Sequence, residues 1–281
     1  MNPPNSPAAE FDPYAPYGPV VETTVRIATW NVWGRFGDVD ERQRLIDQVL
    51  TGYGPDVVAL TESWATGETN QARHVAGVLG HEHQHHFGSL PEDDGWASGI
   101  GVVSRWPIER SEQHDLLDPG GQVRGLMGFA RISGPRGDID LFTLMLDYPL
   151  SAGAVRRHQV QAAAQLVARL TSRRNPSIVC GDFNAGPTSD EIRMLTGQTT
   201  PATEGLVFYD AWEVAGDGGP GTTFARDNPL AAMNLFPDRR FDYIFSAWPR
   251  KGGRGHPVAC QVIGKDPVAS DHYGVMADLR Y

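Results

Sequence analysis

The chain has 281 residues, of which 40% are hydrophobic, and its formal net charge is −10 with a pI near 5.3. This acidic balance disfavours a protein that grips duplex nucleic acid through a basic stripe, because Lys and Arg contacts to phosphate supply most of that affinity. No apolar run approaches membrane-spanning length, and the first residues lack a basic region followed by an apolar segment. We therefore expect a cytoplasmic monomer with no transmembrane segment.

The first part of the chain opens with a proline-rich stretch. Residues 1–22 show no hydrophobic periodicity, which predicts a disordered tail ahead of one domain over residues 23–281. An alternating strand is expected at 23–30, followed by a helix with apolar residues at helical spacing that ends at Gly52 or Gly54. A short buried strand at 57–60 and a helix from Glu68 to Leu79 come next.

Strands then dominate, with two further helices between them. Strand-like segments occur at 83–88, 98–104, 123–132, 138–146, 177–180, 241–246, 258–264 and 273–280. The longest helix is predicted over 152–171, capped by Ser151, with an apolar face of Val155, His158, Ala162, Leu166 and Leu170. Thr188 and Glu191 have the spacing of a capping box for a short helix ending near Gly197. This alternation without a linker predicts stacked sheets covered by outer helices.

Polar residues stand where several of these strands end. Asn31 follows the first strand, Glu62 the second, and Asp182 and Asn184 the strand at 177–180. In the last part of the chain, Asp242 lies within the strand-like stretch at 241–246, and Asp271 and His272 come directly before the strand at 273–280. Acids and amides gathered at strand ends suggest hard-metal chemistry on a phosphate ester.

Each of these residues has a chemical role in such a site. Mg²⁺ takes oxygen ligands, so Glu62 is the best candidate ligand, with the Asn31 amide oxygen and Asp271 as further ones. Asp182 is placed to orient or deprotonate the attacking water, and Asn184 to donate to a phosphate oxygen. His272 needs a partner to fix its tautomer, and Asp242 is a candidate, although spacing alone leaves that pairing open.

At this point the sequence resembles a known family, the endonuclease/exonuclease/phosphatase superfamily with the deoxyribonuclease-I-like fold. The motifs that carry the resemblance occur in the family's order from about residue 25 to 280: Trp30-Asn31-Val32, Thr61-Glu62, Gly181-Asp182-Phe183-Asn184, Arg240-Phe241-Asp242-Tyr243 and Ser270-Asp271-His272. The resemblance implies an α+β fold, a four-layer α/β/β/α sandwich of two mixed sheets. It also implies phosphoester hydrolysis with Mg²⁺ or Mn²⁺, and that Asp242 orients His272 while Asp182 and Asn184 flank the scissile phosphate.

Three residues are substrate-binding candidates within the same resemblance. Arg156 matches a helix of the family, Asn228 lies in a loop that resembles a substrate-side loop of bacterial members, and Tyr148 follows the strand at 138–146. The expected partner is a phosphorylated small molecule, a lipid head group or a nucleic acid. The acidic charge favours the first two over duplex DNA.

One departure from the family pattern concerns Met145. Many members carry Thr-His-Leu-Asp where this chain reads Leu144-Met145-Leu146-Asp147, and a thioether donates neither a hydrogen bond nor a proton. Losing such a group costs about two to four orders of magnitude in rate. Tyr148 or Asp147 could compensate, or the substrate could have a good leaving group. Alternatively, the protein binds a phosphorylated ligand or performs a different biosynthetic reaction.

Overall fold

The computed structural model describes residues 21–90, 95–172, 175–249 and 251–281. Most of the predicted proline-rich tail, residues 1–20, lies outside the described residues. No helix within the described ranges is long and apolar enough to cross a membrane.

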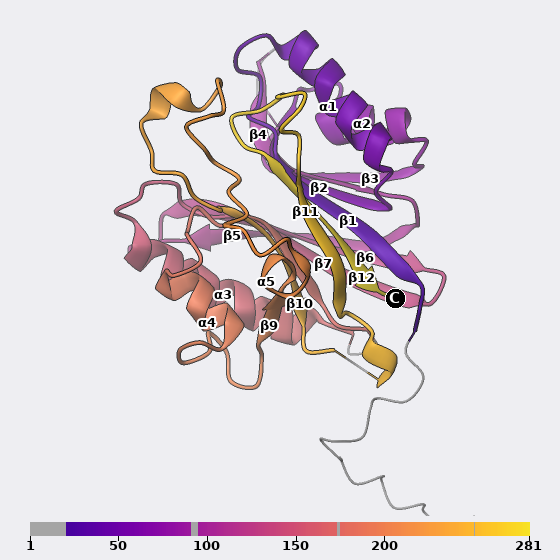
Figure 1. The fold of residues 1–281 in the computed structure, drawn as a ribbon, viewed down its shortest axis with the longest axis vertical. Coiled ribbons are helices and arrows are strands. Elements are labelled where there is room, and N and C mark those ends of the chain that lie inside the picture. The colour runs from indigo at the N-terminus through magenta and orange to yellow at the C-terminus, as the bar shows by residue number, and fades with distance from the viewer. Residues whose placement is uncertain (1–20, 91–94, 173–174, 250) are drawn as a thin grey trace, which may run out of the picture.

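The first of two six-stranded sheets has the order β11-β12-β1-β2-β4-β3. β1 and β2 run parallel, whereas the other pairs in this sheet are antiparallel. Its strands are β1 (Thr24–Asn31), β2 (Val57–Ala65), β3 (His83–Phe87), β4 (Ala97–Ser104), β11 (Pro257–Ile263) and β12 (Gly274–Arg280). The helices α1 (Val39–Tyr53) and α2 (Gln71–Leu79) cover its outer face (Figure 1).

The second sheet has the order β5-β6-β7-β8-β10-β9, in which only β7 and β8 pair in parallel among the described strands. Its strands are β5 (Ile108–Leu117), β6 (Val123–Gly134), β7 (Gly137–Met145), β8 (Ile178–Asp182), β9 (Phe208–Asp210) and β10 (Asp242–Ala247). The helices α3 (Gly153–Leu170) and α4 (Asp190–Thr196) lie outside it (Figure 1). Short pieces complete the fold: α5 (Ala211–Ala215) and the 3₁₀ turns η1 (Ala232–Asn234) and η2 (Lys251–Gly253).

Three hydrophobic layers hold the four structural layers together. The central one joins the two sheets, with Ile27 and Ile100 from one side and Leu141 and Ile244 from the other. Because side chains alternate along a strand, Ala28 and Trp30 of β1 face the opposite way and pack under α1 and α2. An equivalent layer beneath α3 and α4 includes Val160, Val179 and Phe245. The predicted four-layer α/β/β/α sandwich is confirmed.

Most predicted elements are confirmed within a few residues, and the differences have physical causes. β5 was not predicted, because as an edge strand it reads IERSEQHDLL and exposes much of its length to water. The short β9 and α5 were also missed. The second predicted helix starts three residues late, at Gln71, since the Asn70 side chain caps it by accepting from the Arg73 backbone N–H.

The predicted caps of α3 and α4 were wrong, and the predicted apolar face of α3 was right only in part, since Leu170 is buried and Ala162 and Leu166 pack against the core. α3 buries Arg156, Gln159, Val160 and Val167, while His158 is exposed. No side-chain cap from Ser151 forms, and the helix begins after Ala152. The short helix begins after Ser189 without a side-chain cap, so the predicted Thr188–Glu191 capping box does not form. Glu191 instead binds the buried Arg156.

Candidate active site

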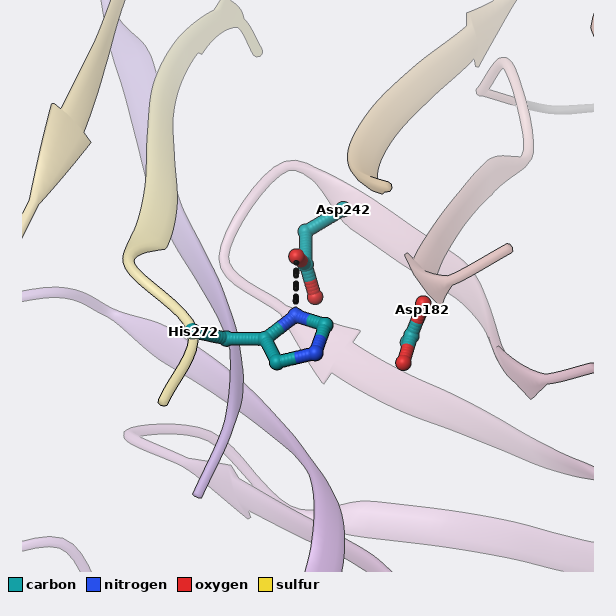
Figure 2. A group of neighbouring side chains, drawn as sticks. All are labelled: Asp182, Asp242 and His272. Carbon is teal, nitrogen blue, oxygen red and sulfur yellow. Dashed lines mark hydrogen bonds and ion pairs between the residues drawn. The ribbon is translucent and has the colours of Figure 1, made fainter. Parts of the chain in front are cut away.

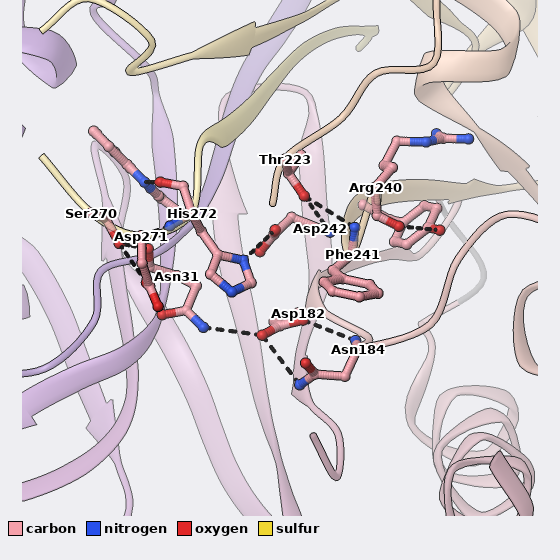
Figure 3. A network of polar contacts seen from close by, with 12 residues as sticks. Asn31, Asp182, Asn184, Thr223, Arg240, Phe241, Asp242, Ser270, Asp271 and His272 are labelled. Atoms are coloured by element: carbon pink, nitrogen blue, oxygen red, sulfur yellow. Dashed lines mark hydrogen bonds and ion pairs between the residues drawn. The ribbon is translucent and has the colours of Figure 1, made fainter. Parts of the chain in front are cut away.

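The two sheets bring their functional strand ends to one place. Asn31 ends β1 of the first sheet, and Asp182 ends β8 of the second. Asp242 opens β10 directly opposite Asp182 in the antiparallel register. The loop before β12 adds Asp271 and His272, so the structure gathers these residues from four separate stretches of sequence (Figure 3).

An acid–histidine pair lies at the centre of this cluster. His272 Nδ1 lies 2.8 Å from Asp242 Oδ2, and both side chains are buried. Figure 2 shows the opposite edge of the ring turned toward Asp182. Burial opposes a charge on the imidazole, but Asp242, Asp182 and Asp271 together outweigh it and raise the pKa of His272 well above its usual value. The expected pairing of Asp242 with His272 is therefore confirmed, and the three carboxylates favour the protonated form of the ring.

Asp182 is the most heavily hydrogen-bonded acid of the site. Its Oδ1 accepts the Asn184 backbone N–H at 2.9 Å, and its Oδ2 accepts the amides of Asn184 and Asn31 at 3.2 and 3.0 Å. Burial and then the charge of Asp242 raise the pKa of Asp182 to about 7, against the opposing charge of His272. A carboxylate with a pKa near neutrality is suited to accepting a proton from water.

Glu62 reaches the site because β2 is irregular there. The β2–β4 register shifts between Thr61 and Ser63, which leaves Glu62 as the extra residue of a β-bulge with a positive φ of 52°. A bulge re-aims one side chain of a strand, and a positive φ in a residue other than glycine is uncommon. Asn184 also has a positive φ, 49°. Two such residues in one cluster are typical of a functional site.

Asn31 connects Glu62 and Asp182, a role that the sequence did not indicate. Its Nδ2 donates to Glu62 Oε1 at 2.9 Å and to Asp182 Oδ2 at 3.0 Å, while its Oδ1 accepts the Trp33 backbone N–H at 3.0 Å. The amide oxygen accepts one backbone hydrogen bond and has a second lone pair, so the role of Asn31 as a metal ligand stays a prediction. In addition, Asn31 positions two carboxylates that come from different sheets.

The donor set fits a hard dication. Burial raises the pKa of Asp271 to about 6, with His272 opposing and the charge of Glu62 adding to the rise. Asp242 Oδ1 is buried and has no hydrogen-bond partner within the described ranges. Clustered carboxylates with unbalanced charge and a free oxygen are what Mg²⁺ or Mn²⁺ binds.

The closest grouping of candidate ligand atoms differs from the predicted ligand set. Within the described part of the chain, one group of acids and histidines places its ligand atoms within 4.8 Å of one another, and it consists of Asp182, Asp242 and His272. Glu62 and Asp271 lie outside that group. Since His272 and Asp242 already bind each other, Glu62 and Asp271 remain the better candidates to hold a cation.

Two further residues support the site. Arg42 was missed by sequence reasoning, whereas Thr223 lies, with Asn228, in the loop that resembles a substrate-side loop of bacterial members. Arg42 of α1 is buried and donates to the carbonyl oxygens of Val32, Trp33, Gly34, Phe36 and Ala269 at 2.8–3.1 Å. The Thr223 hydroxyl accepts a hydrogen bond from the Asp242 backbone N–H at 3.2 Å. The Thr223 backbone carbonyl accepts one from the Tyr273 backbone N–H. Arg42 therefore holds the loops beside Glu62 and Asp271 in place through its hydrogen bonds. Thr223 connects the strand that carries Asp242 to the segment that carries His272. A lone arginine in an amphipathic helix gives no sequence signal for such a role.

Arg156 and Asn228, candidates for substrate binding, make hydrogen bonds within the protein, as was already expected for Arg156, and their contact with a substrate stays a prediction. Arg156 Nε donates to Glu191 at 3.0 Å, and its other nitrogens donate to the carbonyls of residues 147, 149 and 150, so the side chain is buried and fully engaged. Asn228 is fully buried, and its amide donates to the Ser270 carbonyl at 2.8 Å. Both position loops that carry site residues. Tyr148 is 69% exposed beside a cavity, so its substrate role stays a prediction.

The two-sheet sandwich with an acid–histidine site at its strand ends is the deoxyribonuclease-I-like architecture. The chain belongs to the Endonuclease/Exonuclease/phosphatase family, whose sequence model matches residues 28–272. No curated protein matches the sequence significantly.

Solved structures of the same family resemble this chain over most of its length. An endonuclease/exonuclease/phosphatase from Beutenbergia cavernae DSM 12333 is 26% identical with a TM-score of 0.70, covering 92% of this chain and 72% of that one. D. rerio TDP2, solved in complex with a single-strand DNA product, is 20% identical with a TM-score of 0.74, covering 92% of this chain and all of that one. A family protein from Leptotrichia buccalis C-1013-b is 19% identical, with a TM-score of 0.68 and coverages of 92% and 100%.

Proposed function

We propose that this protein is a Mg²⁺- or Mn²⁺-dependent phosphoesterase that hydrolyses a phosphodiester or phosphomonoester in a small molecule, a lipid head group or a nucleic acid. Family membership supports phosphoester hydrolysis. The observation that carries the proposal is the convergence of Asp182, Asp242 and His272 within 4.8 Å, with Asn31 linking Asp182 to Glu62.

Glu62 and Asp271 are the residues proposed to hold the cation. When bound, the cation supplies positive charge that stabilises the phosphoryl oxygens and the leaving oxygen. It would also offset the negative charge of Glu62, which is half-buried, and of Asp271, which is buried. Arg42 contributes positive charge near both acids, but its nitrogens donate to carbonyl oxygens and not to the carboxylates.

The remaining site residues act on water and phosphate. Asp182 orients the attacking water and accepts its proton, and its hydrogen bonds from Asn31 and Asn184 hold it in one rotamer. Asp242 holds His272 at Nδ1, which leaves Nε2 as a charged donor to a phosphate oxygen. Asn184 is placed to donate to the same phosphate.

The test is hydrolysis of bis-p-nitrophenyl phosphate and of a panel of nucleic acids and lipid phosphates, with Mg²⁺ or with excess chelator. Turnover that requires the metal and falls by about two to four orders of magnitude in Asp182→Asn supports the proposal. Absence of metal-dependent turnover on every substrate refutes it.

The position of Met145 favours a second candidate function, a phosphate-binding protein with weakened catalysis. Met145 pairs in register with Asp182, so the thioether lies beside the reaction centre. In this alternative, Met145→His raises activity sharply, while the native protein binds phosphate ligands in calorimetry without turning them over.

A further inference from the structure

The proline-rich stretch ahead of the domain contains a regular three-residue repeat. Residues 13–19 read Pro-Tyr-Ala-Pro-Tyr-Gly-Pro, so prolines stand at 13, 16 and 19 and tyrosines at 14 and 17. A polyproline II helix has three residues per turn, and residues three apart therefore lie along one edge of it. In that conformation the repeat has one proline edge, one tyrosine edge and one edge of small residues.

The repeat joins the domain at Val21, which is bound to residues far away in the sequence. The Val21 backbone N–H donates to the Gly252 carbonyl at 2.9 Å, and the Val21 carbonyl accepts from Arg280 Nη1 at 2.6 Å. Figure 1 shows the indigo start of the described chain close to the orange-yellow turn η2. Pro19 is therefore only two residues from a fixed point on the domain.

An aromatic surface, made by Tyr209, Trp248 and His256, lies near this fixed point. The Tyr209 ring centroid is 5.7 Å from that of Trp248 and 6.5 Å from that of His256. Trp248 is 51% exposed. Burial, and then the charge of Arg280, lower the pKa of His256 and so favour its neutral ring. The aromatic surface therefore offers ring faces to an apolar segment.

The repeat is long enough to cross the aromatic surface. Trp248 and His256 each lie four residues from Gly252 along the chain, so each is at most about 14 Å from it. A polyproline II segment rises about 3.1 Å per residue, which takes Pro13 up to about 25 Å from Val21. The reach of the repeat thus exceeds the distance that it has to cover.

The chemistry of the two parts is complementary. Proline-rich segments dock against aromatic side chains because they are already extended, and their carbonyls make no internal hydrogen bonds. Arg254 Nε is buried and has no hydrogen-bond partner within the described part of the chain, so it can donate to such a carbonyl. The sequence is basic at 250, 251 and 254, whereas the charged side chains of residues 1–20 are Glu10 and Asp12. The charges of the two segments are therefore opposite in sign.

We propose that residues 13–19 pack their proline edge on the aromatic surface and connect the two sheets at the end opposite the active site. β10 runs from Asp242 in the site to the residue before Trp248, and β1 runs from Thr24 to Asn31 in the site. Tyr209 and Trp248 belong to the second sheet, and His256 directly precedes β11 of the first.

The experiment measures paramagnetic broadening of NMR signals in the full chain. Ala15→Cys places a thiol on the edge of small residues, where a nitroxide label leaves the prolines and tyrosines unchanged. The native Cys180 and Cys260 are buried, and burial raises the pKa of both thiols to about 12, so they react poorly with the label.

The expected result is strong broadening of signals from the aromatic surface. The Trp248 indole N–H and the backbone amides of residues 252–256 should lose their signals, and reduction of the nitroxide should restore them. The indole signals of Trp33 and Trp64 are internal controls and should stay sharp, because these residues lie beside Asn31 and Glu62 at the other end of the sheets.

Variants identify the contact. Replacing the prolines at 13, 16 and 19 together with alanine should abolish the broadening. The matched control replaces the prolines at 3, 4 and 7, which changes as many prolines farther from Val21 and should keep it. Trp248→Ala should also abolish the broadening, read at the amides of residues 252–256.

Three results would overturn the inference. Sharp signals in the labelled protein show that the repeat does not dock, and this measurement needs none of the alanine variants. Broadening that survives loss of the prolines at 13, 16 and 19 shows that the proline edge is not the contact. Equal broadening in isotope-labelled protein without nitroxide, mixed with nitroxide-labelled protein, shows that the repeat docks on a second copy. None of these measurements uses turnover, so the proposed function is tested separately.

Discussion

Asn31 Nδ2 lies 3.0 Å from Asp182 Oδ2, and this contact joins the end of β1 in one sheet to the end of β8 in the other. The same nitrogen donates to Glu62. A single amide therefore sets the spacing between the residue proposed to orient water and a residue proposed to hold the cation.

Removing this amide should impair catalysis more than folding. In Asn31→Ala the two carboxylates lose their common donor, and displacement of a reacting group by about 1 Å costs roughly 10²-fold in rate. We expect kcat/KM for bis-p-nitrophenyl phosphate to fall by about that factor. Asn70→Ala is the matched control, because it removes the cap of α2 and should cost about 1 kcal/mol of stability without changing kinetics. Equal kinetics for Asn31→Ala and the native protein would contradict the assigned role.

The protonation of His272 should depend on Asp242. The pKa of His272 is raised in the folded protein, so its proton contributes stability below the unfolded value of about 6.5 and loses that contribution as pH rises through the folded value. Asp242→Asn should lower the pKa of His272, which NMR of the imidazole protons can follow in chelator-treated protein. Asp47→Asn removes the acid from an exposed pair with His74 and should leave the His272 titration unchanged. An unshifted titration in Asp242→Asn would count against the buried pair.

The ion pair beneath the loop at residues 147–150 should be important for stability. Arg156 and Glu191 are both buried, and removing one partner of a buried pair costs about 3–5 kcal/mol because the other charge is left uncompensated. We expect Arg156→Met to lower the free energy of unfolding in urea by that amount. Arg156→Met combined with Glu191→Leu should recover much of the loss. A double variant no more stable than the single one would show that the packing, and not the charge, is responsible.

A bound cation should stabilise the fold through Glu62 and Asp271. A ligand at 100 times its Kd adds about 2.7 kcal/mol to the free energy of unfolding. We expect Mg²⁺ or Mn²⁺ to raise the melting temperature of the native protein, and Glu62→Gln or Asp271→Asn to abolish most of that rise. Glu109→Gln, on the exposed face of β5, is the control and should keep it. A rise of the same size in all four proteins would place the cation elsewhere.

Sequence reasoning located the site because its residues are marked by local patterns. Glu62, Asp182 and Asp271 each follow or precede an apolar strand, and that much is visible in the chain. The pairing of Asp242 with His272 joins residues 30 positions apart through the packing of two sheets, so it needed the resemblance to a family and then the structure. The roles of Arg42 and Asn228 depend on backbone carbonyls of distant loops, which no side-chain pattern reveals.

Contacts with distant backbone groups, which the sequence does not show, also explain the errors in the predicted buried face of α3. Apolar spacing favoured a face through His158, yet the helix buries Arg156 and Gln159, whose polar atoms find partners in the loop after β7 and in β5. Burial of satisfied polar groups cannot be recognised before those partners are known.

The β-bulge at Glu62 lowers the stability of the fold but places a side chain that the proposed activity requires. A left-handed backbone costs an ordinary residue about 1 kcal/mol or more and costs glycine almost nothing. Exchanging Glu62 for glycine would therefore remove the backbone strain in β2 and yield a protein that is more stable but catalytically inactive. Engineering for heat resistance that ranks variants by melting temperature alone would tend to choose this exchange and lose the enzyme.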